Sequence, residues 1–190
     1  MQRSGKIILQ DFFARKPDTV ARQLLGKLLV NIKLDMAGVI LETEPYFGPE
    51  DPASRARKGG DLARTMASQP CTALVYGVHR QWLLNIVAHE PNSLGAVLIR
   101  GILPVNVASG TAAGKAIWGP GRVTRYLGIN KDLHKKFLCS EDSEVRPVYF
   151  LDIDEPCVSR SSRIGVREDL PEPLNFKINC IDEINRMLKK

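Results

Sequence analysis

Short stretches in which apolar and polar residues alternate run through most of the chain, separated by glycine, proline and aspartate. Alternation over about four to eight residues predicts half-buried β-strands, and short turns between such stretches favour antiparallel pairing. The predicted strands cover residues 27–32, 39–44, 71–76, 82–88, 96–103, 145–153 and 174–178. The first two flank a turn at residues 35–38 and are expected to form a hairpin.

Helical signals are found in three places. The first predicted helix runs from Pro17 to Gly26, where apolar residues recur at helical spacing. In the second, Pro120 takes the favoured first position of a short basic helix over residues 121–127, and Gly128 ends it. Asp182 is a candidate N-cap for a short C-terminal helix. Successive strands with helices at the edges imply the α+β class, with a mostly antiparallel sheet.

The size and composition fit a single soluble domain over residues 1–190. A length of 190 residues suits one domain, and 44% hydrophobic with 25% charged residues is ordinary for a globular protein. The apolar run at the N-terminus is too short for a signal peptide, and no stretch approaches the roughly 20 apolar residues of a membrane span. We therefore expect an intracellular monomer in the cytoplasm or nucleoid, or in the nucleus of a eukaryote.

The cysteines and histidines lack the spacing of a metal site. Cys71, Cys139, Cys157 and Cys180 form no C-x-x-C motif and have no nearby histidine pair. We interpret them as scattered, reduced thiols, as is usual inside cells. Neither a metal nor an organic cofactor is expected.

The net charge of +6 suggests a polyanionic partner. Most of the excess lies between residues 115 and 140, where Asp132 is the only acidic residue before Ser140. The basic residues of this segment are Lys115, Arg122, Arg125, Lys131, Lys135 and Lys136. They are candidates for contacts with a DNA backbone. A solvated helical face would account for the same charges equally well.

The segment over residues 39–51, VILETEPYFGPED, has the most informative pattern. Alternate residues of a strand share a face, so Glu42 and Glu44 point the same way. Pro45 disfavours continuation of the ladder, and the strand would therefore deliver a carboxylate and the ring of Tyr46 to a sheet edge. By pattern alone, a surface strand with two solvated glutamates is the commoner case.

This segment and several others resemble the alkyladenine (3-methyladenine) DNA glycosylase family. The resemblance begins with ETEPYFGPEDPAS at residues 42–54 and spans roughly residues 16 to 178. The further matches, in order, are VYG at 75–77, NI at 85–86, VLIR at 97–100, LP at 103–104, GPG at 119–121, LGI at 127–129, RIGV at 163–166 and PL at 173–174. This resemblance implies one compact α+β domain around a curved antiparallel sheet.

The resemblance also implies a hydrolytic centre. Glu44 matches the carboxylate that activates the attacking water as general base. Arg100 matches an arginine near that water and the target phosphate, a role suited to a fixed guanidinium. A charge at the end of a strand would be the commoner reading of Arg100. Ile164 matches a residue whose backbone carbonyl helps to hold the water.

Three further matches imply a pocket for a flipped base. Tyr46 matches an aromatic residue that stacks on the extruded base. Asn85 matches an asparagine on the pocket floor that disfavours the exocyclic amine of guanine. Tyr76 matches a tyrosine that is wedged into the duplex, where it offsets the few kcal/mol that unstacking costs.

The sequence departs from the family at the pocket. Arg55 stands where the family usually has a histidine, and Ala73 where it has an aromatic residue. The chain also has two more residues than expected between Tyr76 and Asn85. We hypothesise that Trp82 in this longer segment rebuilds the missing wall and that Arg55 points outward to a phosphate. Core packing of Trp82 is the competing interpretation.

The sequence therefore predicts a monofunctional DNA glycosylase that hydrolyses the N-glycosidic bond of alkylated or otherwise damaged purines in double-stranded DNA. Base flipping and water activation would place it in base excision repair. Two alternatives remain: a non-catalytic nucleic-acid-binding module of the same fold, and an enzyme that acts on a base in RNA or on a free nucleoside.

Overall fold

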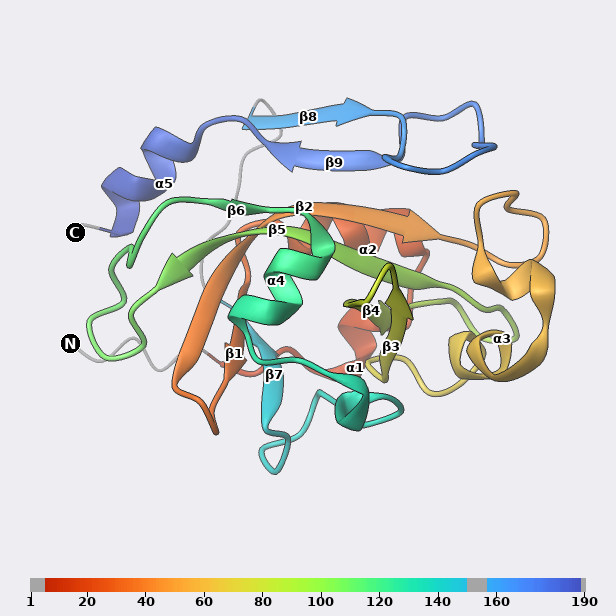
Figure 1. Cartoon of the computed structure of the whole chain (residues 1–190), viewed down its shortest axis with the longest axis horizontal. Helices are drawn as coiled ribbons and strands as arrows, with labels where there is room; N and C mark the ends of the chain where they lie inside the picture. Colours follow the sequence, from red (N-terminus) through yellow and green to blue (C-terminus); the bar gives the residue numbers. More distant parts are fainter. Residues whose placement is uncertain (1–5, 150–156, 189–190) are drawn as a thin grey trace.

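A computed structural model describes residues 6–149 and 157–188. One antiparallel sheet organises the chain, with strand order β3-β4-β5-β2-β1-β7 (Figure 1). Outside this order, β6 pairs with β5, β9 pairs with β2, and β8 pairs with β9. The strands are β1 (Leu28–Asn31), β2 (Met36–Tyr46), β3 (Ala73–Val78), β4 (Gln81–Val87), β5 (Ala96–Val105), β6 (Ile117–Trp118), β7 (Val145–Val148), β8 (Val158–Ser161) and β9 (Asn175–Ile178). The predicted α+β class with a curved, mostly antiparallel sheet is confirmed.

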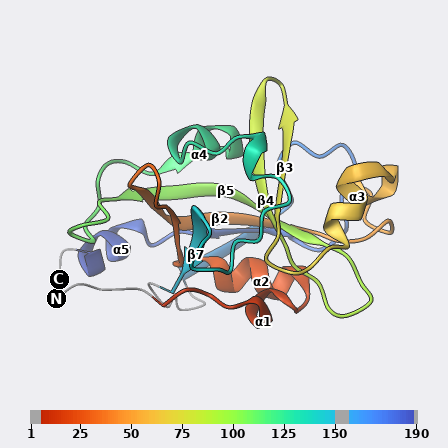
Figure 2. The same ribbon diagram turned by 90° about the horizontal axis from the view of Figure 1, so that it is seen from below.

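The helices lie on both sides of the sheet. In Figure 2, α1 and α2 lie on one side, whereas α4 and the projecting β3–β4 hairpin lie on the other. The helices are α1 (Gln10–Phe13), α2 (Pro17–Leu24), α3 (Gly60–Met66), α4 (Pro120–Tyr126) and α5 (Ile181–Leu188), with 3-10 turns η1 (Arg55–Lys58) and η2 (Lys131–Leu133). None of these helices has the length and apolar character needed to span a membrane.

The long strands β2 and β5 form the middle of the sheet, and their pairing is irregular near the acidic residues. The register shifts on both sides of Glu42, so that Leu41 of β2 and Arg100 of β5 have no partner across this ladder. Such β-bulges bend a strand and re-aim its side chains. Pairing between β2 and β5 also continues past Pro45 to Tyr46, contrary to expectation. β9 pairs with the other edge of β2 only as far as Thr43, so that edge is open at Pro45 and the proline is tolerated there.

The core has a large and a small part. The large cluster lies between the sheet and its covering helices and includes Phe13, Leu24 and Ile99. The small cluster of Ala56, Met66, Leu74, Val87 and Ala96 lies beside α3, and Tyr46 and Tyr76 pack against it. The two tyrosines therefore share one apolar support.

Most of the predicted elements are present, with shifted ends. The C-terminal helix begins at Ile181, so Asp182 lies in its first turn and is not its N-cap. The strand predicted over residues 145–153 is β7, which ends at Val148, and the part of that prediction at residues 150–153 lies outside the described residues. The pattern did not reveal α1, η1, α3, β6 or β8, which are short or lack a clear periodicity.

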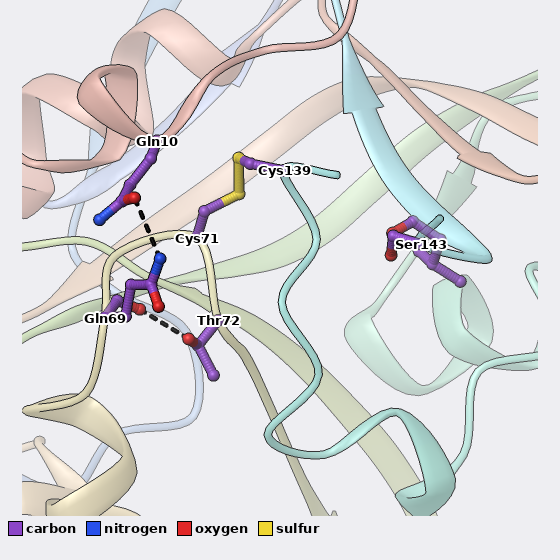
Figure 3. Close-up of a disulfide and its surroundings, with 7 residues drawn as sticks. Gln10, Gln69, Cys71, Thr72, Cys139 and Ser143 are labelled. Carbon is purple, nitrogen blue, oxygen red and sulfur yellow. Dashed lines mark hydrogen bonds between the residues drawn. A yellow bond between two sulfur atoms is a disulfide. The ribbon is translucent and has the colours of Figure 1, made fainter. Parts of the chain in front are cut away.

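The interpretation of the cysteines as free thiols is wrong. All four form disulfides, Cys71–Cys139 and Cys157–Cys180, with Cα–Cα distances of 5.9 and 5.4 Å. Figure 3 shows the first of these beside the hydrogen bond from Thr72 Oγ1 to the Gln69 carbonyl. The separations of 68 and 23 residues gave no signal of pairing, because the fold alone brings the partners together.

The Cys71–Cys139 disulfide is expected to stabilise the fold through its long loop. Closing a loop of this size restricts the unfolded chain and typically stabilises by about 2–4 kcal/mol. The Cys71→Ala, Cys139→Ala variant should lose that amount in denaturant unfolding under oxidising conditions. The Cys157→Ala, Cys180→Ala variant is the matched control with a shorter loop. If reductant leaves the unfolding midpoint of the wild type unchanged, this role is wrong.

Candidate active site

A row of four paired residues crosses the middle of the sheet. Glu44 of β2 pairs with Leu98 of β5, Leu98 pairs with Asn85 of β4, and Asn85 pairs with Leu74 of β3. Directly paired residues point to the same side of a sheet. The sheet thus sets Glu44 and the pocket-floor candidate Asn85 two strands apart on one face.

Glu44 is fully buried, and separate segments donate hydrogen bonds to its carboxylate. Oε1 accepts from the Ile164 backbone N–H at 2.8 Å and from Asn175 Nδ2 at 2.9 Å. Oε2 accepts from the Tyr46 hydroxyl at 2.9 Å and from Arg100 Nη1 at 3.4 Å. The interpretation of a solvated surface strand is therefore wrong, and the carboxylate has one fixed orientation.

Glu42 forms a second buried carboxylate next to Glu44. Asn175 Nδ2 donates to Oε1 of both residues at 2.9 Å, and Arg100 Nε lies 3.2 Å from Glu44 Oε1 and 3.8 Å from Glu42 Oε1. Two carboxylates thus share one guanidinium and one amide. Asn175 and Glu42 were not identified as site residues from the sequence, because Asn175 comes from β9, more than 130 positions along the chain from Glu44.

Burial raises the pKa of Glu44 above its ordinary value, and the charge of Arg100 and the hydrogen bonds from Asn175, Ile164 and Tyr46 counteract this only in part. The pKa of Tyr46 is also raised, first by burial and then by the adjacent Glu44. The Tyr46 hydroxyl therefore keeps its proton and donates a hydrogen bond to the carboxylate.

An ion-pair network holds the segment that contains Ile164. The buried guanidinium of Arg163 makes two hydrogen bonds of 2.7 Å to Asp51, and its Nε donates to Asp169 at 2.8 Å. Asp51 also accepts from Phe47 N at 3.0 Å, so the network ties the turn after β2 to the segment before β9. The Arg163 hydrogen bonds lower the pKa of Asp51 despite its burial.

A cavity of about 870 Å³ lies beside the residues that hydrogen-bond to the Glu44 carboxylate. Among the predicted residues, Tyr46, Tyr76, Arg55, Arg100, Ile164 and Arg122 line it. Asn85 is 2% exposed and donates to the Leu74 carbonyl at 3.3 Å, next to Leu98, which lines the cavity. Arg100 lies inside β5 and not at a strand end, because that strand continues to Val105.

Two of the expectations about the altered pocket do not agree with the geometry. Ala73 is fully buried in the large core and does not line the cavity, because alternation in β3 turns Leu74 and Tyr76 to the cavity side. Trp82 does not line it either. It lies on the other face of β4 from Gln81 and Leu83, and its 37% exposure also excludes a role in the core.

The tryptophan that does line the cavity is Trp118 of β6. Its ring lies against Gly101 of β5, where an added Cβ would come within 2.7 Å of it. Lys177 Nζ lies 4.1 Å from the ring centroid. No sequence pattern identified Trp118, because a strand of two residues has no periodicity.

The remaining basic candidates are spread over the surface. Lys115, Arg122, Arg125, Lys131, Lys135 and Lys136 are all exposed. Lys135 is paired with Asp61 at 2.5 Å, and His134 Nε2 lies 3.0 Å from the same carboxylate. These two contacts lower the pKa of Asp61 to about 2. Lys135 therefore has a protein partner as well as solvent access.

The family model for methylpurine-DNA glycosylase matches residues 11–180. A 3-methyladenine DNA glycosylase inferred for Aeropyrum pernix is 41% identical over 92% of this chain and 90% of the relative. Those inferred for Myxococcus xanthus and Salinibacter ruber are 35% and 34% identical, over 83% and 82% of this chain and 80% and 84% of the relatives.

The chain belongs to the methylpurine-DNA glycosylase family. The predicted family is thereby confirmed, and with it a hydrolase of DNA repair that acts on alkylated bases. The match extends through β9, the strand that supplies Asn175 to the buried carboxylates. In the described part of this glycosylase, no group of three or more potential ligands is arranged to hold a metal ion.

The stability of the Glu44→Gln variant relative to the wild type should increase as the pH rises. A carboxyl whose pKa is raised in the folded state contributes stability that is lost as the pH increases from its ordinary pKa of 4.5 through the folded value. The difference in melting temperature between variant and wild type should therefore grow between pH 4 and pH 8. Glu90→Gln, at an exposed glutamate, is the control. A difference that is independent of pH would contradict a buried charge at Glu44.

Loss of the Asn175 amide should shift the pH dependence of base excision. Asn175→Ala removes a donor that stabilises the Glu44 carboxylate, whereas Arg100, Tyr46 and Glu42 still face it. The pKa of Glu44 should rise further, so the acid limb of the single-turnover rate should move to higher pH. Asn179→Ala, at an exposed residue beyond β9, is the control. An equal loss at every pH would indicate only a structural role for Asn175.

Proposed function

We propose that this glycosylase removes damaged purines from duplex DNA by a monofunctional mechanism, in which an activated water attacks C1′ of an extruded nucleotide. The observation that supports this most strongly is the buried, fixed carboxylate of Glu44, whose hydrogen-bond partners Tyr46, Arg100 and Ile164 line the cavity. General bases of this kind typically contribute about 10²–10⁴-fold to the rate.

Oε2 of Glu44 is the oxygen that would take the proton of the water. Oε1 already accepts two short hydrogen bonds, from Ile164 and Asn175. Oε2 accepts one short hydrogen bond, from Tyr46, and a long one from Arg100. Within the described chain, Arg100 Nε is buried and makes no hydrogen bond, although it lies 3.2 Å from Glu44 Oε1, which supports a contact with the water or with a phosphate. Ile164 would add its carbonyl to the same water.

The proposed bond changes balance as follows. The water oxygen bonds to C1′ while the C1′–N9 bond breaks, and its proton passes to Glu44. The electron pair of the broken bond leaves with the base. An alkylated, cationic purine leaves as a neutral molecule, whereas a neutral purine leaves as an anion and then takes a proton from solvent. Positive charge that develops on the sugar is stabilised by the carboxylates of Glu42 and Glu44.

Base flipping follows from the size of the damaged base and its position inside a duplex. Tyr46 would stack on the extruded base, Asn85 would disfavour an exocyclic amine, and Tyr76 in the projecting hairpin would fill the space in the duplex (Figure 2). Arg122 at the cavity, with the other exposed cations of residues 115–136, would contact phosphates. Such contacts make affinity strongly dependent on salt.

Glu44→Gln should bind lesion-containing duplexes as tightly as the wild type but lose at least about 100-fold in single-turnover excision, because glutamine cannot accept the proton. The measurement is base release from duplexes with one defined lesion each, with Glu90→Gln as the control. More than about a tenth of the wild-type rate in Glu44→Gln would argue against the general base. If the wild-type protein binds the lesion duplexes but releases no base, the chain is a non-catalytic module. If the wild-type protein releases the base faster from duplex RNA than from duplex DNA, RNA is the substrate.

A further inference from the structure

Arg55 is held at the cavity by the turn that precedes it. It begins η1, whose N-cap Ser54 accepts a hydrogen bond from Ala56 N at 3.1 Å, and Arg57 donates to the Pro52 carbonyl at 3.1 Å. The half-buried guanidinium of Arg55 lies 5.3 Å from the centroid of the Tyr76 ring and lines the cavity. It thus contributes to the cavity wall, contrary to the expectation that it points outward.

The guanidinium of Arg55 has donors without acceptors. Among residues 6–149 and 157–188, no side-chain or backbone oxygen accepts a hydrogen bond from it, and no carboxylate forms an ion pair with it. Arginine has five N–H donors and cannot act as an acceptor. A half-buried guanidinium in this condition is suited to a ligand that offers acceptor atoms.

Both aromatic walls of the cavity already have a cation against them. Arg163 lies 4.6 Å from the centroid of the Tyr46 ring, and Arg55 lies on the Tyr76 ring. The cations that line the cavity are Arg55, Arg57, Lys58, Arg100, Arg122 and Arg167, whereas Glu168 is the one lining carboxylate among the described residues. Tyr46, the ring proposed to stack on the base, thus already has a cation against it, and a positively charged base would face further positive charge.

We propose that Arg55 selects neutral purine lesions with acceptor atoms on the O6–N7 edge, such as hypoxanthine, over cationic N-alkylpurines. This inference rests on the proposed function, because it assumes that the base enters this cavity. A neutral purine leaves with the electron pair of the C1′–N9 bond, and that negative charge spreads over its ring nitrogens and O6. The guanidinium donates hydrogen bonds to this charge as it develops. A cationic purine leaves as a neutral molecule, so no net negative charge forms on its edge, and in the bound state the guanidinium repels it.

The test compares two lesions in one duplex sequence: hypoxanthine, which is neutral, and 7-methylguanine, which is cationic and lacks a free N7 acceptor. Single-turnover excision is measured for the wild type, Arg55→Gln and Arg57→Gln. In Arg55→Gln, hypoxanthine excision should fall at least tenfold while 7-methylguanine excision stays constant or rises. Arg57→Gln, which removes a charge two residues away in the same turn, should change both lesions by the same factor.

A second measurement separates lesion selection from folding and chemistry. Affinities for both lesion duplexes and for undamaged duplex are compared between Glu44→Gln and the Glu44→Gln, Arg55→Gln double variant. The ratio of the affinity for the hypoxanthine duplex to that for the 7-methylguanine duplex should be at least tenfold lower in the double variant than in Glu44→Gln. The affinity for undamaged DNA should be the same in both variants. If affinity for all three duplexes falls together, Arg55 binds a phosphate and the inference is wrong. Retained excision by Glu44→Gln would instead contradict the proposed function.

Discussion

The burial of the Glu44 carboxylate is the constraint on which the rest of the site depends. A buried charge is tolerated only when donors surround it, and here the donors come from segments far apart in the chain: Arg100 of β5, Asn175 of β9 and the backbone N–H of Ile164. The bulged pairing of β2 and β5 and the addition of β9 at the open side of β2 bring them together. The fold therefore supplies orientation, and it retains a base that burial makes stronger.

The Arg163 network extends this constraint beyond the sheet. Ile164 can donate to Glu44 only if its segment stays in place, and it has no strand partner to hold it. The guanidinium of Arg163 links Asp51, Asp169 and the Pro45 carbonyl, at 2.7, 2.8 and 2.9 Å respectively. Removing one partner of such a buried pair leaves an uncompensated charge and is strongly destabilising. The same residues thus fix a loop, the end of β2 and the backbone donor to the Glu44 carboxylate.

Much of the sheet could be predicted from the sequence, because alternation over β2, β4 and β5 is a local property. The shared face of Glu42 and Glu44 followed from the same alternation, and the resemblance added the roles of Tyr46 and Arg100. The partners of the buried carboxylates could not be predicted in this way. Asn175 and Trp118 lie in short strands whose position depends on tertiary pairing, and the pairing of Cys71 with Cys139 depends on the completed fold. Trp82 shows the limit most clearly. Its place in the sequence suggested a pocket wall, but alternation along β4 places its side chain on the face opposite the cavity.

The cavity combines two opposite electrostatic requirements. In the proposed reaction the sugar develops positive charge, which the buried carboxylates of Glu42 and Glu44 would stabilise, whereas the cations that line the cavity would attract the phosphates of the DNA. Arg100 lies between these two regions, 3.2 Å from Glu44 and on the cavity surface. One guanidinium faces two carboxylates, so in the proposed complex negative charge would remain on the sugar side. The side of the cavity formed by Tyr76 and Arg55 carries positive charge, and in the proposed reaction that gradient would favour departure of an electron pair with the base.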